Sequence, residues 1–129
     1  MSETSYVFDA SALLCVIYQE PGADVVARHF DGAVISSVNY SEVVAKLQQR
    51  GASDEDIAAG LADININIAA FDTDSAIRAG KLRKATRHRG LSLGDRACLA
   101  LAITQDAVAV TTDKAWASLD IGVKVQVVR

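Results

Sequence analysis

The chain of 129 residues is long enough for one domain and too short for two, because domains commonly contain roughly 100 to 200 residues. Half of the residues are apolar, 22% are charged and one is proline, which excludes a disordered or collagen-like chain. The formal net charge is −3. Aromatic residues make up only 5%, so the core should be aliphatic, as in parallel strands covered by small-residue helices. We expect residues 1–129 to form a single domain.

The sequence lacks the features of a membrane or exported protein. Its longest uninterrupted apolar run, residues 97–103, is far shorter than the roughly 20 residues that cross a bilayer, and the N-terminal stretch has no signal segment. Cys15 and Cys98 lie in apolar stretches without the spacing of a disulfide framework or a zinc site. We expect a cytoplasmic protein with two buried free thiols and no membrane contact.

Charge is distributed unevenly along the chain. Residues 78–96 carry seven basic side chains and one acid, a net charge of +6, whereas the rest of the chain nets −9. A basic segment in an acidic protein indicates a local contact with a polyanion; the alternative is a solvated helix whose charges serve only solubility. Charge taken alone favours the solvated helix.

Short apolar runs alternate with segments of helical character. In chain order the expected elements are a strand at 6–8, a helix at 10–18, a helix through Val25, Val26 and Phe30, a strand at 33–36, a helix with the face Tyr40, Val43, Val44 and Leu47, a helix starting at Ser53, a strand at 65–70, a helix at 73–88, a helix capped by Ser92, a strand at 108–111, a short helix at 114–119 and a strand at 123–128. No hairpin signals separate the strands. The sequence therefore predicts an α/β fold, a three-layer sandwich with a mostly parallel central sheet flanked by helices.

Four acidic residues are placed where a parallel sheet has its ligand site, beyond the carboxyl ends of its strands. Asp9 ends the first strand and Asp113 follows the fourth, while Glu42 and Asp95 lie on helices that could border the same edge. Each acid also has an ordinary role as a helix cap, a first-turn charge or a solvated side chain. If the four converge, either protonation or a divalent cation must relieve their repulsion. Oxygen ligands of this kind suit Mg²⁺ or Mn²⁺.

Other chemistries lack their motifs. The chain contains neither of the glycine-rich patterns GxGxxG and GxxxxGK[ST], which disfavours dinucleotide and P-loop nucleotide binding. Neither His29 nor His88 has a nearby serine or cysteine in a nucleophile motif. The acidic residues therefore remain the strongest candidates for a catalytic site.

The segments around these acids are VFDASALL, SSVNYSEVVAKL, LSLGDRACLALA and VTTDKAWASLDIGV. In this order they resemble the four acidic motifs of PIN-domain ribonucleases, particularly the VapC toxins of bacterial toxin–antitoxin modules, over nearly the whole chain. The resemblance implies a Mg²⁺- or Mn²⁺-dependent endoribonuclease whose catalytic and metal-binding residues are Asp9, Glu42, Asp95 and Asp113. The polar positions that accompany this quartet are matched by Ser11, Asn39 and Thr111, which implies supporting roles.

The reaction that the resemblance implies is hydrolysis of an RNA phosphodiester by a metal-activated water, leaving 5′-phosphate and 3′-hydroxyl ends. Because carboxylates cannot bind phosphate directly, basic side chains outside the acidic cluster should hold the RNA, namely Lys84, Arg87, Arg89 and Arg96. Single-stranded or looped RNA is the expected substrate. The implied partners are a second copy of the chain in a homodimer and a small antitoxin whose C-terminal segment covers the groove.

Two alternatives remain open. A haloacid-dehalogenase-like phosphatase also places a nucleophilic Asp after its first strand and needs Mg²⁺, but it has a second Asp two residues later, where this chain has Ser11. A catalytically inactive PIN domain that only binds RNA or protein would have lost some acids, and all four are present. The nuclease is the preferred interpretation.

Overall fold

The computed structural model describes residues 4–129, which form five strands, six α-helices and two 3-10 helices. The strands are β1 (Tyr6–Phe8), β2 (Val34–Ser36), β3 (Asn67–Ala69), β4 (Val108–Thr111) and β5 (Lys124–Val127). The helices are α1 (Ala10–Ile17), α2 (Ala23–Ala27), α3 (Ser37–Gln49), α4 (Asp54–Ala62), α5 (Thr73–Thr86), η1 (Arg87–Arg89), α6 (Leu93–Thr104) and η2 (Lys114–Ser118).

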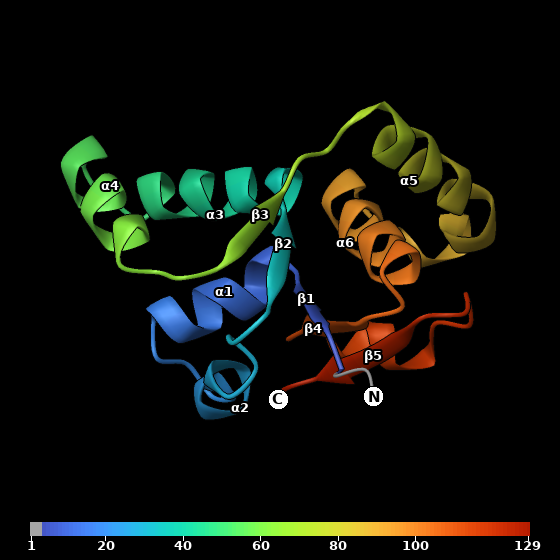
Figure 1. The fold of residues 1–129 in the computed structure, drawn as a ribbon, viewed down its shortest axis with the longest axis horizontal. Helices are drawn as coiled ribbons and strands as arrows, with labels where there is room; N and C mark the ends of the chain where they lie inside the picture. The colour runs from blue at the N-terminus through green and yellow to red at the C-terminus, as the bar shows by residue number, and fades with distance from the viewer. Residues whose placement is uncertain (1–3) are drawn as a thin grey trace.

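All five strands form one parallel sheet in the order β3-β2-β1-β4-β5 (Figure 1). The expected three-layer α/β fold is confirmed, and within the described residues every strand pair is parallel. β1 occupies the middle of the sheet, where Phe8 pairs with Ile35 on one side and Val110 on the other. The chain leaves β1 towards β2 and returns later to β4, so the strand order reverses between β1 and β4. Such switch points are where open parallel sheets bind ligands.

The two helical layers follow from the alternation of side chains along β1. Val7 faces α6 and packs in a cluster with Leu99 and Trp116, whereas Phe8 faces α1 and α2 and packs with Ala12. Both Val7 and Phe8 have no exposed surface. Strands buried on both faces read as continuous apolar runs, which explains why so short a strand is visible in the sequence.

Helices begin directly where strands end, so their caps lie at the sheet edge. Asp9 follows β1 at once and caps α1, accepting from Ala12 N. Ser36 ends β2 and caps α3, accepting from Val38 N. Since capping side chains satisfy the free amides of a first helical turn, they fix both elements relative to each other. The edge therefore carries polar side chains whose positions are set by the backbone.

The predicted elements are all present, with differences at their ends. The helix expected through Phe30 ends at Ala27. Phe30 lies in the segment after it and packs edge-on against Phe8, with ring centroids 5.2 Å apart. The basic helix expected at 73–88 is α-helical only as far as Thr86 and then tightens into η1. Both cysteines are free and buried, as expected.

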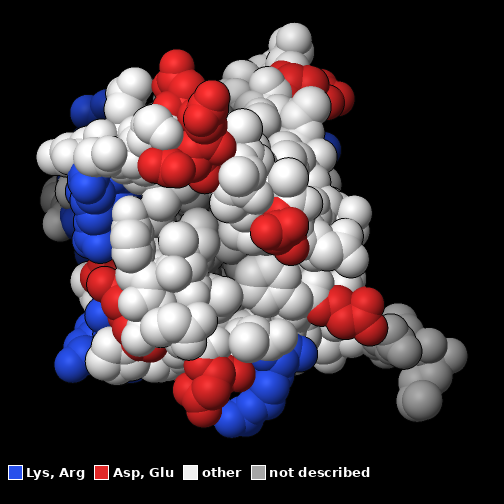
Figure 2. Space-filling model, turned by 90° about the vertical axis from the view of Figure 1, so that its left-hand side faces the viewer, with Lys and Arg blue, Asp and Glu red and all other residues white. Residues whose placement is uncertain are grey.

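The basic helix α5 lies on the other side of the sheet edge from α2 and α4 (Figure 1). The basic helix α5 lies at the right of Figure 1, packed against α6. Figure 2 shows the opposite side, that of α2 and α4, where acidic side chains form several patches and basic ones lie towards the margins. Within residues 4–129, no helix is both long and apolar enough to cross a bilayer.

Candidate active site

A cleft at the carboxyl ends of β1 and β4 brings together all four predicted acids. It has a volume of about 290 Å³ and is bordered by residues of α1, α3 and α6. Its lining residues are Asp9, Ala10, Ser11, Leu14, Asn39, Glu42, Lys46, Asp95 and Asp113. Asp9 and Asp113, 104 positions apart in the chain, thus share one cavity at the switch point of the sheet. We call this cavity the acidic cleft.

Asp9 is the deepest of the four acids, with 6% of its surface exposed. Its Oδ1 accepts hydrogen bonds from Ser11 Oγ at 2.7 Å and Ala12 N at 2.8 Å. Its Oδ2 accepts from Thr111 Oγ1 at 2.5 Å. The hydroxyls of Ser11 and Thr111 also receive the amides of Thr112 and Asp113, each at 3.0 Å, which tie the segment after β4 to Asp9.

Burial raises the pKa of Asp9 from its ordinary 3.8 to about 6, despite the opposing hydrogen bonds from Thr111, Ser11 and Ala12. The charge of Asp95 adds to the rise. A buried carboxylate without a cation is costly, because desolvation disfavours its charged form. A cation bound next to Asp9 would therefore favour its ionised form and lower this pKa.

Glu42 reaches the cleft from α3 and lies against the first turn of α6. Asn39 Nδ2 donates to Glu42 Oε1 at 3.0 Å and to the carbonyl of Gly94 at 2.9 Å. Partial burial raises the pKa of Glu42, the hydrogen bond from Asn39 opposes the rise and the charge of Asp95 adds to it. Asn39 is 1% exposed, and its Oδ1 is buried without a partner in the described part of the chain.

Asp95 and Asp113 are held by local capping bonds. Asp95 Oδ2 accepts from Ser92 N at 3.0 Å while Ser92 Oγ accepts from Asp95 N, a reciprocal capping box at the start of α6. Asp113 Oδ1 accepts from Ala115 N and caps η2. Each carboxylate keeps lone pairs free beyond its cap, because an ionised carboxylate can accept about four hydrogen bonds.

The donor set of the acidic cleft fits a hard divalent cation. It consists of four carboxylates and the unpartnered Asn39 Oδ1, all oxygen atoms. None of these four carboxylates forms an ion pair within residues 4–129, where the salt bridges join Arg28 to Asp24 and Arg129 to Glu20. In the same residues no three His, Cys, Asp or Glu side chains already form a complete metal-binding group. Metal binding would therefore require the carboxylates to turn towards a shared ion.

The predicted RNA-binding residues have different environments. Lys84 and Arg87 are exposed on the basic segment. Arg89 is exposed but donates to the carbonyl of Ser118 at 2.6 Å, next to the segment that carries Asp113. Arg96 is half-buried and donates to the carbonyl of Ala79 at 3.0 Å, which joins α6 to α5. Arg96 thus has a packing role that the sequence did not reveal.

Sequence reasoning missed Lys46, the one basic residue that lines the acidic cleft within the described chain. It lies one helical turn after Glu42 on α3, at the i+4 spacing that puts two side chains on the same helix face. That spacing was visible in the sequence and could have drawn attention to Lys46. It places a positive charge at the rim of the carboxylate cluster.

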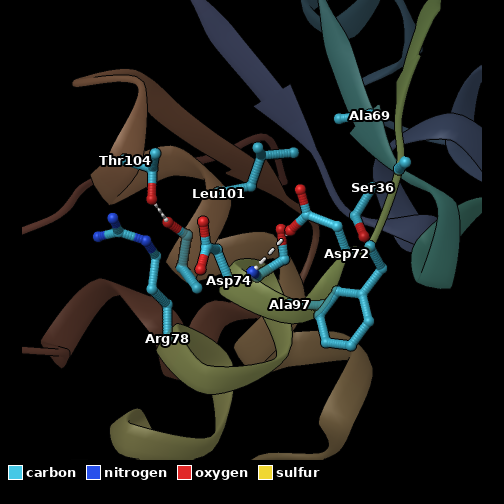
Figure 3. Close-up of a pocket in the computed structure, with 12 residues that line it drawn as sticks. Ser36, Ala69, Asp72, Asp74, Arg78, Ala97, Leu101 and Thr104 are labelled. Atoms are coloured by element: carbon cyan, nitrogen blue, oxygen red, sulfur yellow. Dashed lines mark hydrogen bonds between the residues drawn. The ribbon is translucent and has the colours of Figure 1, made fainter.

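A second cavity of about 210 Å³ lies between α5, α6 and the ends of β2 and β3 (Figure 3). It also contains acids, since Asp72 and Asp74 line it. Asp72 caps α5, and hydrogen bonds from Ser75 lower its pKa. This cavity meets α6 on the face of Ala97 and Leu101, opposite to the face of Asp95 by helical geometry, so it is separate from the acidic cleft.

The protein is an α/β protein with a parallel sheet and four carboxylates at the switch point of that sheet. Comparison with known families identifies the family to which it belongs. The PIN domain family matches residues 6–122. The chain therefore belongs to the PIN domain family. The phosphatase alternative is not supported by this match. A search of curated proteins finds no match.

Solved structures with the same fold include chains of toxin–antitoxin complexes and a toxin on its own. A chain of VapBC2 from Rickettsia felis, bound to promoter DNA, is similar with a TM-score of 0.76 and 16% identity over 95% of this chain and 98% of that chain. VapBC from Salmonella typhimurium, also DNA-bound, gives 0.76 and 17% over 96% and 98%. VapC20 from Mycobacterium tuberculosis, a sarcin-ricin loop cleaving toxin, gives 0.70 and 15% over 92% and 98%. This similarity establishes that the chain has the fold of these proteins.

Proposed function

We propose that this protein is a Mg²⁺- or Mn²⁺-dependent endoribonuclease that acts as the toxin of a toxin–antitoxin pair. The observation that carries the proposal is the convergence of Asp9, Glu42, Asp95 and Asp113 in one cleft at the switch point of the sheet. Membership of the PIN domain family supports a nuclease. The similar fold of VapC20, described as cleaving the sarcin-ricin loop, supports RNA as the substrate.

The four carboxylates of the acidic cleft would hold the cation. When bound, a divalent cation activates a water molecule for attack on the phosphorus and screens the charge that develops on the phosphate. Thr111 and Ser11 hold both oxygens of Asp9 in place and favour its ionised form, which is the form that binds a cation. Asn39 donates to one carboxylate oxygen of Glu42 and likewise favours its ionised form.

RNA would be held by cations outside the carboxylate cluster. Lys46 at the rim of the cleft is placed to neutralise a phosphate next to the acids. Lys84, Arg87 and Arg89 extend the positive charge along the basic segment, and Arg96 adds to it from the start of α6. These side chains would bind phosphates of the backbone. Single-stranded or looped RNA is the preferred substrate because its bases can be splayed out of a helix.

The test of catalysis compares the wild type with Asp9→Asn on looped RNA in Mg²⁺ or Mn²⁺, followed by sequencing of the RNA ends. Asp9→Asn should abolish cleavage while the fold remains intact, because it removes a charged ligand without changing side-chain size. Asp31→Asn, which alters an exposed acid outside the cleft, is the matched control and should cleave as the wild type does. A folded Asp9→Asn protein that cleaves RNA at the wild-type rate would contradict the proposal.

The toxin role implies a small antitoxin encoded beside this protein. The acidic cleft offers a basic C-terminal peptide charge complementarity, and relatives of the same fold occur in VapBC complexes. The neighbouring gene product should co-purify with this chain, and its proteolysis should restore ribonuclease activity. If no neighbour binds and expression alone is harmless, the toxin role is wrong and the nuclease proposal stands.

A homodimer is also proposed, and light scattering of the purified chain measures it.

A further inference from the structure

Gly94, in the first turn of α6, lies directly against the carboxylate of Glu42. A Cβ atom at this position would lie 2.6 Å from Cδ of Glu42 and still nearer to both of its carboxylate oxygens. Real Cβ atoms essentially never have contacts under 3.0 Å. The Glu42 carboxylate therefore occupies the space that a side chain at position 94 would need.

The same two groups are joined by Asn39. Its Nδ2 donates both to Glu42 Oε1 and to the Gly94 carbonyl, 55 positions away along the chain. Asn39 is almost fully buried, so its amide group is fixed by its surroundings. The contact between Glu42 and Gly94 is thus part of a defined junction between α3 and α6.

The backbone of Gly94 does not itself require glycine. Gly94 is helical and is not among the glycines with positive φ, so alanine would suit its conformation and would raise helix propensity. Its presence at a buried helical position is accounted for by the space it leaves to Glu42 and not by a turn.

We propose that Gly94 is a positioning residue that admits the Glu42 carboxylate to the start of α6, next to Asp95. In a Gly94→Ala chain the flexible end of Glu42 yields before the helix backbone does, because rotation about its side-chain bonds relieves the clash at little cost. Glu42 then leaves Asn39 and the cleft, while the fold stays intact. The consequence for cation binding rests on the proposed metal-dependent function, whereas the placement of Glu42 does not.

The placement is tested by a crystal structure of the metal-free Gly94→Ala chain. The expected result is a Glu42 carboxylate turned away from α6, with its hydrogen bond to Asn39 lost and the path of α6 unchanged. A Glu42 that stays in place while the start of α6 shifts would overturn the inference. Because no cation is involved, this result is independent of whether the protein is a metal-dependent nuclease.

The consequence is tested by calorimetric titration with Mn²⁺. Gly94→Ala should lower the affinity by about 10-fold to 100-fold, the usual effect of removing support from a ligand. Glu42→Gln should lower the affinity in the wild type but cause no further loss in Gly94→Ala, because the two residues act as one unit. Additive losses, or an unchanged affinity in Gly94→Ala, would show that Gly94 does not act through Glu42.

The matched control is Gly60→Ala on α4, the same change in a helix where a Cβ would meet nothing within 4 Å. It should bind Mn²⁺ as the wild type does and be no less stable. If the wild type itself binds no Mn²⁺, the metal-dependent function fails, and the crystal structure alone still decides the role of Gly94.

Discussion

Thr111 donates a hydrogen bond to Asp9 across 102 positions of the chain, from the end of β4 to the end of β1, with Oγ1 and Oδ2 2.5 Å apart. This contact spans the switch point of the sheet. The same Thr111 oxygen receives the amide of Asp113 at 3.0 Å. One hydroxyl therefore orients the most buried carboxylate and fixes the backbone of another acid, so its removal should disturb both.

Thr111→Val should destabilise the protein by about 1–3 kcal/mol, because the Asp113 amide loses its acceptor and Oδ2 of the buried Asp9 carboxylate loses its donor. It should also raise the pKa of Asp9 further, since a hydrogen bond to the carboxylate lowers that pKa. Urea unfolding measures the first effect. The control is Thr112→Val, because the Thr112 hydroxyl makes no hydrogen bond in the described structure. Equal urea midpoints for the two variants would contradict this role of Thr111.

The metal-free protein should lose stability as the pH rises through the pKa of Asp9. The folded chain keeps the Asp9 proton up to about pH 6, whereas the unfolded chain releases it near the ordinary value of 3.8. The folded state therefore binds more protons between these values, and this contribution is complete below 3.8 and lost above 6. Two pKa units correspond to about 3 kcal/mol. The raised pKa of Glu42 acts in the same direction.

Asp9→Asn should remove most of this pH dependence and make the chain more stable than the wild type at neutral pH. Urea midpoints measured across the acidic to neutral range, without divalent cations, test the prediction. Asp31→Asn should follow the wild-type curve, because Asp31 is exposed. A wild type whose stability rises from pH 4 to pH 7, about the window of this linkage, would show that the raised pKa of Asp9 does not govern the pH dependence of stability.

Lys46→Gln should have opposite effects on the two ligands of the cleft. Lys46 lies beside Glu42 in the acidic cleft, and its ammonium group repels Mn²⁺ and attracts phosphate. Its loss should therefore strengthen Mn²⁺ binding and weaken RNA binding. Calorimetry and RNA binding at fixed salt measure the two affinities. Lys124→Gln on β5 makes the same charge change away from the cleft. If both variants change the two affinities equally, the effect is one of net charge and not of position.

Replacement of Lys84, Arg87 and Arg89 together by Gln should weaken RNA binding and flatten its dependence on salt, because fewer phosphate contacts release fewer counterions. Cleavage at saturating RNA should persist. The control replaces Arg28, Arg50 and Lys124 by Gln, with the same net charge but outside the basic segment. An unchanged salt dependence in the first variant would mean that the segment is a solvated helix.

Much of the fold could be predicted because its elements are marked locally. The buried strand before Asp9 and the capped helix after Ser92 follow from short-range apolar runs and capping residues. The meeting of Asp9 with Asp113 also follows, because the carboxyl ends of parallel strands share one edge.

The remaining features depend on contacts between distant segments. The contact between Asn39 and Gly94 exists only because α3 and α6 pack side by side, which no local pattern encodes. Charge alone assigns Arg96 to RNA binding, while its tie to the Ala79 carbonyl depends on how α5 packs on α6. The spacing of Phe30 predicts a helical position, yet α2 ends at Ala27 and Phe30 packs against Phe8 from the segment that follows.

The pairing of β1 with β4 sets the moment at which the site can exist during synthesis. A ribosome adds about 5–20 residues per second, so the 102 positions between Asp9 and Thr111 correspond to roughly 5 to 20 seconds of translation. Throughout that interval β1 lacks its β4 neighbour and Asp9 lacks the Thr111 hydroxyl. An incomplete nascent chain therefore has no assembled acidic cleft. The acidic cleft can therefore assemble only when the chain is nearly finished.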